Sequence, residues 1–327
     1  MKKLITMLFL INGIFWGQSP FGSEPLVHTY SIVARDRNTG EMGVAVQSHW
    51  FSVGTIVSWG EAGVGVVATQ SFVNPAFGPD GLNLLKEGKS AKEALDILLA
   101  ADEGKDVRQL AILDKSGNAA AFTGNNCIPF TGHIEGKDYS VQANLMASET
   151  VWPAMSKAFL ENDHLPLAER LVAVLEAGEK EGGDIRGKQS AALLIVKAES
   201  TGKVWEDRSV DIRVDDNTEP LKELRRILKV HRAYEHMNKG DIEVEHGNME
   251  GAKLEYSAAE EMFPDNLEMK FWHAVTLANQ GEIEESLVLF KKVFRQDNNW
   301  KILTPRLIKP GLLTVSELDL NRIMELP

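Results

Sequence analysis

The chain has 327 residues, of which 43% are hydrophobic, so it can form one large domain with a packed core and a smaller second domain. Its formal net charge of -12 has the wrong sign for binding a phosphate backbone, and we expect no nucleic-acid partner. The single cysteine, Cys127, excludes an intrachain disulfide and a thiolate-rich metal cluster.

The N-terminus has the composition of an export signal. Lys2 and Lys3 precede an apolar run over residues 4–16, which suits a secretory signal and is too short to span a membrane. Small residues between positions 17 and 23 supply the expected cleavage site, so the sequence predicts a signal peptide over residues 1–23. No later apolar run reaches about 18 residues. We therefore expect a periplasmic or secreted protein that is not embedded in a membrane.

The first elements expected after the signal are strands. Apolar residues at every second position over 30–34 and 42–46, on either side of the turn sequence RNTG, predict a hairpin. A continuous apolar run over residues 63–72 predicts a buried strand. The 3.6-residue spacing that follows predicts two helices paired around Gly88.

Strands and helices then follow in the same order a second time. A second hairpin is expected with its turn at residues 115–117, and YSVQANLMA predicts a short strand. Two amphipathic helices are expected over about 149–161 and 165–180, and a last apolar strand over 189–197. Strands grouped before and after helical pairs, without strict alternation, predict a layered α+β domain.

The pattern changes at Pro220 and stays helical to about residue 298. It predicts a connecting helix over residues 217–238, a small all-α tetratricopeptide-like array over residues 239–300 and a C-terminal tail over residues 301–327. Two repeats are fewer than a tetratricopeptide array needs to be stable alone, so we expect this array to depend on the main domain for its stability. The pairs of small or aromatic residues that recur at the 34-residue period are Gly247 and Gly281, Ala252 and Ser286, Tyr256 and Phe290, and Ala259 and Val293.

Several stretches of the sequence together resemble one family. They are TYSIVARDRNTGEMGVAVQSHWFSVG, GVVATQSFVNPAFGPDGLNLL, RQLAILDKSGNAAAFTG, YSVQANLM, and AGEKEGGDIRGKQSAALLIVK running on to VDIRVDDNTEPLKELRRI. The family is an uncharacterised bacterial one classed as Ntn-hydrolase-like, that is, with an N-terminal nucleophile, and the resemblance covers roughly residues 29–230. It implies a four-layer αββα sandwich over residues 29–216, in which the first strand begins with the nucleophile. Intracellular members start Met-Thr, and removal of that methionine would expose the threonine that matches Thr29.

Thr29 is therefore the candidate catalytic nucleophile. A threonine at a free N-terminus has its own α-amine, whose pKa of about 7.7–8.0 lets it accept the hydroxyl proton at physiological pH. In this chain the bond between His28 and Thr29 must first be cut, either by signal peptidase, for which LVH is a poor site, or by the protein itself. Two alternatives stay open. Thr29 simply begins a strand, or Ser31, two positions along the same face, is the nucleophile.

Acyl transfer also needs hydrogen-bond donors for the developing oxyanion. Gln142 and Asn144 are two positions apart, so a strand presents both side chains on one face, and we assign them this catalytic role. Gln70, with Asn74 near it, is a weaker candidate of the same kind and is assigned to substrate binding. The alternative for these amides is hydrogen bonding to neighbouring backbone.

A glycine-rich sequence, GGDIRGKQS, contributes three more residues assigned to substrate binding, Asp184, Arg186 and Gln189. Its glycines allow close approach of the backbone, and an arginine can hold a carboxylate through two hydrogen bonds. In the alternative interpretation, Asp184 and Arg186 pair with each other and fix the loop.

Arg35 and His49 complete the residues assigned to substrate binding. Arg35 shares the face of Thr29, where a cation would favour a neutral terminal amine; alternatively it pairs with a carboxylate such as Asp36 on a solvated hairpin. His49 follows a strand and could orient the substrate or act as an acid, or it is a half-buried histidine with a hydrogen-bond partner.

Other catalytic and metal-binding motifs are not found in the sequence. Cys127 and His133 have no evident third partner for thiol catalysis. His231 and His236 are five residues apart and would diverge on a helix. Calcium-loop and phosphate-loop patterns are absent from the sequence as well, so we expect neither a metal nor a cofactor.

Two functions are consistent with these observations. The first is an exported Ntn-type hydrolase that cleaves an amide bond of a small molecule or peptide. Its helical array would recruit a protein partner or restrict access to the site. The second is a non-catalytic binding or scaffold protein on the same fold, with the array as its interaction surface. Either protein could form a homo-oligomer.

Overall fold

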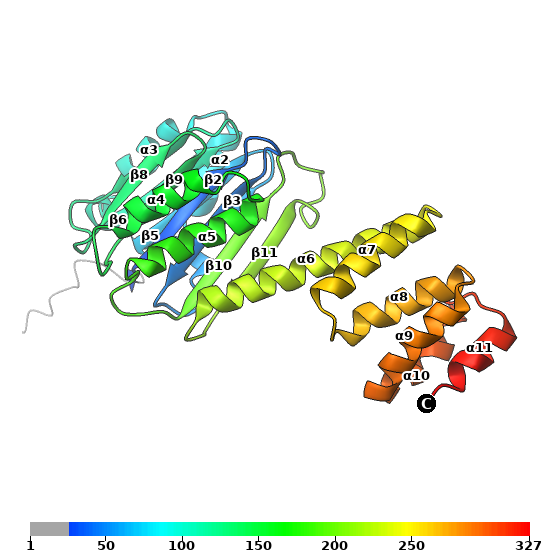
Figure 1. Cartoon of the computed structure of the whole chain (residues 1–327). Helices are drawn as coiled ribbons and strands as arrows, with labels where there is room; N and C mark the ends of the chain where they lie inside the picture. The colour runs from blue at the N-terminus through cyan, green and yellow to red at the C-terminus, as the bar shows by residue number, and fades with distance from the viewer. Residues whose placement is uncertain (1–25) are drawn as a thin grey trace, which may run out of the picture. The chain divides into compact units, whose positions relative to one another are not determined.

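The computed structural model describes residues 26–327, so the expected signal peptide lies outside the described residues. The chain divides into two compact units, Met1–Leu221 and Lys222–Pro327 (Figure 1). None of the helices within residues 26–327 combines the length and the apolar character needed to cross a membrane. The α+β class expected from the sequence is confirmed.

The first unit contains a six-stranded antiparallel sheet in the order β11-β10-β3-β2-β9-β8. The expected first hairpin forms its centre, with Thr29 opposite Ser48 and Arg35 opposite Met42. β9 pairs with the free edge of β2, and β10 pairs with the free edge of β3. The strands of this sheet are β2 (Thr29–Arg35), β3 (Met42–Ser48), β8 (Gly132–Gly136), β9 (Tyr139–Ala143), β10 (Ser190–Val196) and β11 (Arg208–Val214).

The second sheet of this unit has five strands and is built around β5. One edge of β5 pairs with β6 along its length, whereas two short strands share the other edge. β4 lies opposite residues 65–68, and β1 lies opposite Ser71 and Phe72. The chain therefore leaves this sheet with β1 and enters the other sheet at Thr29. The strands are β1 (Leu26–Val27), β4 (Ser58–Glu61), β5 (Gly65–Phe72), β6 (Arg108–Asp114) and β7 (Ala119–Thr123).

The two sheets face each other, and a pair of helices covers the outer face of each (Figure 1). An apolar cluster that includes Val44, Val66 and Leu194 lies between the sheets. Because helices cover the outer faces, β3, β5 and β10 are buried along their whole length. α2 and α3 cover the five-stranded sheet, and α4 and α5 cover the six-stranded sheet. The helices of this unit are α1 (Gly54–Val57), α2 (Phe77–Lys86), α3 (Ala91–Ala100), α4 (Val151–Glu161) and α5 (Leu167–Lys180), with a 3-10 turn, η1 (Lys105–Val107).

The helix pair around Gly88 shows why these elements could be predicted. Gly88 has a φ of +87°, a backbone conformation that suits glycine, and it follows the end of α2. α3 then begins with a capping box, in which Ser90 and Glu93 satisfy each other's main-chain N–H groups. Strands β1, β4, β8 and β11 were not predicted, because they are very short or lie at sheet edges where polar residues are tolerated.

The second unit is helical, and its repeated residues occupy equivalent places. α7 and α9 begin 34 residues apart, and the glycine before each has a positive φ, +72° at Gly247 and +83° at Gly281. Tyr256 and Phe290 are both buried at the same point of their helices. The helices are α6 (Pro220–Glu245), which crosses the boundary between the units, α7 (Met249–Met262), α8 (Leu267–Asn279), α9 (Ile283–Gln296), α10 (Asn298–Leu303) and α11 (Glu317–Met324), with a 3-10 turn, η2 (Thr304–Leu307).

Candidate active site

Thr29 lies where the chain passes from one sheet of the first unit to the other. It is the first residue of β2 and its side chain is completely buried. The hydroxyl Oγ1 donates to the carbonyl oxygen of Val27 at 3.1 Å. Ser31, on the same face of β2, donates to the Gln70 side chain of the facing sheet, so this face of the strand looks into the sandwich.

The carbonyl oxygen of His28 accepts two hydrogen bonds from side chains. Ser48 Oγ donates to it at 2.5 Å, and Arg186 Nη2 donates to it at 2.8 Å. This oxygen belongs to the peptide bond that must be cut to free Thr29. A hydroxyl and a guanidinium directed at one carbonyl oxygen would stabilise negative charge developing there.

Asp184 fixes the position of Arg186. Its Oδ1 accepts hydrogen bonds from Arg186 N at 2.9 Å and Nε at 3.0 Å, and its Oδ2 accepts one from Nη2 at 2.7 Å. The main-chain N–H of His49 donates to the same Oδ2 at 3.1 Å. The Asp184 carboxylate is fully buried, so the paired guanidinium has one preferred place. The pair therefore fixes the loop, as in the alternative interpretation of the sequence, and Arg186 Nη2 also reaches the carbonyl oxygen of His28. A role of Asp184 and Arg186 in substrate binding stays a prediction.

The carbonyl oxygen of Thr29 is held by a separate set of amides. Asn144 donates to it through its main-chain N at 3.0 Å and its Nδ2 at 3.3 Å, and Gln70 Nε2 donates at 3.2 Å. Gln109 accepts at Oε1 from Gln70 Nε2 at 2.7 Å and from Asn144 Nδ2 at 2.8 Å. Asn144 and Gln70 therefore lie at the site, but their donors fix the main chain of Thr29 and do not point at the oxygen of His28.

Gln142 lies one step further along the same network. Its Nε2 donates to Ser31 Oγ at 2.7 Å, and its Oε1 accepts from Ser140 at 3.1 Å. Ser31 is thereby held between Gln70 and Gln142 in the middle of a buried strand. Asn74 lies after the end of β5, where its side chain accepts from the main chain of Ala76.

The imidazole of His28 is also part of the buried cluster. Its Nδ1 lies 2.8 Å from Asn144 Oδ1, which can only accept, so Nδ1 is the protonated nitrogen. Burial lowers the pKa of His28 below its usual 6.5, and the nearby guanidinium of Arg186 acts in the same direction. The ring packs edge-on against Phe72 with centroids 5.8 Å apart. His28 is thus a neutral side chain seated in the site.

Two non-glycine residues with a positive φ border this cluster. Ser71, with a φ of +74°, pairs with Val27, and Leu145, with a φ of +57°, follows Asn144. Each such backbone costs on the order of 1–3 kcal/mol and persists only where its surroundings hold it. The two strained residues therefore lie next to Gln70 on β5 and Asn144 after β9, the residues that hold the main chain of Thr29.

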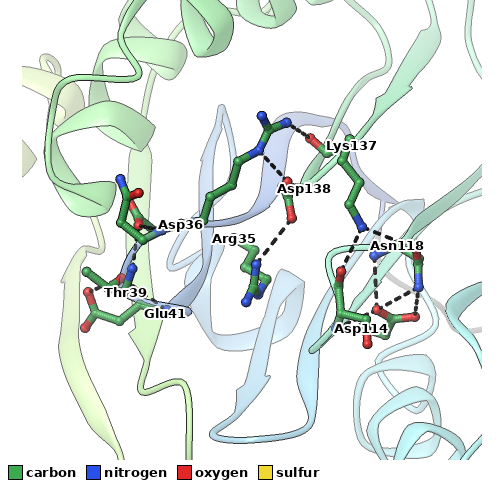
Figure 2. A network of polar contacts seen from close by, with 11 residues as sticks. Arg35, Asp36, Thr39, Glu41, Asp114, Asn118, Lys137 and Asp138 are labelled. Atoms are coloured by element: carbon green, nitrogen blue, oxygen red, sulfur yellow. Dashed lines mark hydrogen bonds and ion pairs between the residues drawn. The ribbon is translucent and has the colours of Figure 1, made fainter.

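Arg35 lies at the opposite end of β2, six residues from Thr29 and roughly 20 Å along the strand. Its Nη1 is 3.5 Å from Asp138 Oδ1, and Arg37 Nε donates to Oδ2 of the same aspartate at 2.6 Å. Figure 2 shows this cluster at the hairpin turns, where Lys137 Nζ donates to Asn118 Oδ1 in the turn that follows β6, and Asn118 Nδ2 in turn donates to Asp114. The structure does not bring Arg35 to the candidate nucleophile.

The remaining predicted residues lie at the rim of the site or away from it. The His49 side chain is exposed and lies beside Gly187. Gln189 donates through Nε2 to Asp216 at 3.2 Å, so it points away from His28. Cys127 is buried, and burial raises the pKa of its thiol, which makes it a poor nucleophile. His133 bonds Thr123 Oγ1 at 2.8 Å.

Three side chains at the site were not predicted from the sequence, those of Ser48, Gln109 and His28. The signal for Ser48 was present, because a hairpin that turns at RNTG sets residue 48 opposite residue 29. Gln109 is on β6 of the facing sheet, and no local pattern shows which residues of two packed sheets will meet. For His28, the sequence indicates an unfavourable cleavage position, and only the folded chain shows that its imidazole contacts Asn144.

Comparison with known proteins places the chain in a family. A search of curated proteins finds no match. Among solved structures, the crystal structure of protein SPO2555 from Silicibacter pomeroyi, which is assigned to the DUF1028 family, is similar, with 30% sequence identity and a TM-score of 0.56. The similarity covers 62% of this chain and 88% of that one. The family model for DUF1028 matches residues 29–224. The chain therefore belongs to DUF1028, a family of unknown function.

Proposed function

We propose that the protein is an exported Ntn-type hydrolase, which cleaves itself between His28 and Thr29 and then cuts an amide bond of its substrate with Thr29 as the N-terminal nucleophile. The observation that carries the proposal is the pair of donors, Ser48 Oγ and Arg186 Nη2, on the carbonyl oxygen of His28. If Thr29 only began a strand, the carbonyl oxygen of His28 would not need these two donors. The buried Asp184 that orders Arg186 adds to the argument.

Self-cleavage would proceed through an ester. Thr29 Oγ1 attacks the carbonyl carbon of His28, and Ser48 and Arg186 stabilise the resulting oxyanion. The carbon–nitrogen bond then breaks and the hydroxyl proton passes to the Thr29 nitrogen, which leaves His28 joined to Thr29 Oγ1 as an ester. Water hydrolyses this ester to give a carboxylate on His28 and a free α-amine on Thr29.

Turnover of a substrate would use the same groups. The free amine of Thr29 accepts the hydroxyl proton as Oγ1 attacks the substrate carbonyl. Ser48 and Arg186 would hold the carbonyl oxygen, while Asn144 and Gln70 keep the main chain of Thr29 in place. The leaving amine takes the proton, and water releases the acyl group from Thr29.

The fold supports this assignment. Two facing sheets with a helical pair outside each give the order helix, sheet, sheet, helix that an Ntn sandwich requires, with the candidate nucleophile beginning a central strand. The equivalent positions of Tyr256 and Phe290 in helices 34 residues apart support a tetratricopeptide-like array in the second unit. We assign that array to binding a protein partner.

The decisive test follows the fate of one bond. The full chain from residue 24 is purified, incubated, and analysed by intact mass for a product that begins at Thr29. We expect first-order cleavage at a rate independent of protein concentration, retained in Thr29→Ser and absent in Thr29→Ala. The variant Gln189→Ala, on the same loop as Arg186, is the matched control and should be cut normally.

Equal cleavage of Thr29→Ala and the natural chain would overturn the proposal. A folded natural chain that keeps residue 28 indefinitely and hydrolyses no amide would favour the alternative, a binding or scaffold protein on this fold. In such a protein the nitrogen of Thr29 stays acylated and cannot act as a base. Its hydroxyl stays buried and cannot reach a substrate.

A further inference from the structure

We infer that the substrate is an extended peptide, bound as a short strand on the edge of β5, with an apolar β-branched residue at the place of Val27 and a side chain that donates a hydrogen bond at the place of His28. This inference rests on the proposed function and specifies its substrate class. The segment Leu26–His28 is then the protein's own first substrate, still in its site.

The edge of β5 is where an extended substrate would bind. One edge of this strand is covered by β4 only over residues 65–68, and beyond them it is β1 that pairs with Ser71 and Phe72. Cleavage after His28 would release β1 and open the Ser71 main chain, which pairs with Val27, two residues before Thr29. An open strand edge of this kind binds extended peptides through main-chain hydrogen bonds.

The ester intermediate links the protein's own leading segment to its substrate. Self-cleavage leaves the acyl group of Val27-His28 on Thr29 Oγ1. A free peptide with the same last two residues before its cleaved bond would form the same ester on the same atom. A site that completes its own processing must hydrolyse that ester, so the places of Val27 and His28 are acyl-side subsites of the mature enzyme.

The side chains define what these subsites accept. Val27 is fully buried in the apolar cluster between the sheets, to which Ala68 and Val73 also belong. A charged side chain there would have no partner and would bind poorly. The imidazole of His28 donates to Asn144 Oδ1 and packs against Phe72. A small amide without these groups would leave both places empty and the edge at Ser71 unpaired.

The test uses the mature full chain and a peptide that copies the segment. The mature chain is obtained by self-cleavage or by an engineered protease site directly before Thr29. The probe is acetyl-Leu-Val-His joined through an amide to aminomethylcoumarin, whose release is fluorescent. We expect kcat/KM to fall at least about 100-fold when Val is replaced by Asp. Two further peptides are methylated at the Leu nitrogen or at the Val nitrogen. We expect kcat/KM to fall about tenfold or more for one of them, because neighbouring residues of an antiparallel strand alternate in donating to the partner strand.

Binding is measured separately from turnover. The Thr29→Ala variant, released at the same engineered site, is titrated with acetyl-Leu-Val-His amide and with its Asp and N-methyl analogues by calorimetry. Thr29→Val, which keeps the β-branched shape of the buried side chain but lacks the hydroxyl, is the second variant. Selective binding of the unmodified peptide is the expected result.

The outcomes separate the two proposals. If the mature chain hydrolyses amides but cleaves the unmodified, Asp and N-methyl peptides at equal rates, or if the variants bind them all equally, the substrate inference is wrong and the proposed function stands. If the variants bind selectively while the natural mature chain releases no coumarin from any probe, the peptide site is real and the hydrolase function is wrong.

Discussion

Ser48 lies directly opposite Thr29 in the central hairpin, and its hydroxyl donates across to the carbonyl oxygen of His28 at 2.5 Å. Two residues that face each other across a strand pair thus supply the proposed nucleophile and one of the proposed oxyanion donors. The second donor, Arg186, comes from a loop far along the chain and depends on Asp184 for its place.

Both donors to the carbonyl oxygen of His28 are predicted to accelerate self-cleavage. We expect Ser48→Ala and Arg186→Lys each to slow it by roughly 10²–10³-fold, because each loses a donor to the oxyanion. Lysine keeps the charge of Arg186 but not its paired hydrogen bonds to Asp184. The measurement is the rate of appearance of the chain beginning at Thr29 by intact mass. Normal rates in both variants would show that these donors have only a structural role.

Gln109 is predicted to stabilise the first unit without touching the reacting atoms. Its Oε1 accepts from Gln70 and Asn144, and its Nε2 donates to the carbonyl of Ala143 at 2.9 Å. Gln109→Leu leaves these buried partners without a hydrogen bond, and each unsatisfied group lowers the free energy of unfolding by about 1–3 kcal/mol. We expect the free energy of unfolding in urea to fall by about 3 kcal/mol or more. The control Gln189→Leu, whose amide bonds only one exposed carboxylate, should change it by less than about 0.5 kcal/mol.

The lowered pKa of His28 predicts a pH dependence of stability. The unfolded chain takes up a proton near pH 6.5, whereas the folded chain resists it until a lower pH, so stability is full above 6.5 and is lost as the pH falls below it. The loss cannot exceed about 1.4 kcal/mol per pH unit for one group. In the uncut Thr29→Ala background, adding His28→Gln should flatten the fall in the urea midpoint between pH 6.5 and 5.

His133 supplies the control for this experiment, because burial lowers its pKa in the same direction. His133→Gln should remove its own share of the pH dependence and leave that of His28 intact. An unchanged profile in the His28 variant would mean that His28 takes up a proton equally in the folded and unfolded chains.

Self-cleavage is predicted to be independent of core mutations in the helical unit, because the residues around His28 and Thr29 all belong to the first unit. Phe290 is fully buried and lies 5.8 Å from Phe271 and 5.4 Å from Phe294, measured between ring centroids. Phe290→Ala should lower the free energy of unfolding of the helical unit by about 3–5 kcal/mol. Self-cleavage at residue 28 should be unaffected. Val288→Ala, at an exposed position of the same helix, is the matched control, and a slowed cleavage in Phe290→Ala would contradict the independence.

Local patterns in the sequence predicted the elements that depend on local chemistry. The hairpin at RNTG, the helices around Gly88 and the 34-residue recurrence of Tyr256 and Phe290 follow from turn residues and periodicity. The pairing of β1 with β5 could not be predicted, because two residues carry no periodicity. The same limit applies to Arg186, since only the folded loop shows which carbonyl its guanidinium reaches.

Arg35 illustrates a different limit. A shared face of a strand says nothing about distance along it, and six residues are enough to move a side chain from one end of the sandwich to the other. Gln142 faces Ser31 across the strand pair, and its amide donates to Ser31 and not to the carbonyl oxygen of His28.

The bond between His28 and Thr29 is near the beginning of the chain, while Asp184 and Arg186 are supplied more than 150 residues later. During synthesis the arginine emerges long after the threonine. A cut that relies on both must wait until the whole first unit has assembled, so loss of the leading segment would mark each molecule as correctly folded, and misfolded copies would remain locked in an inactive form.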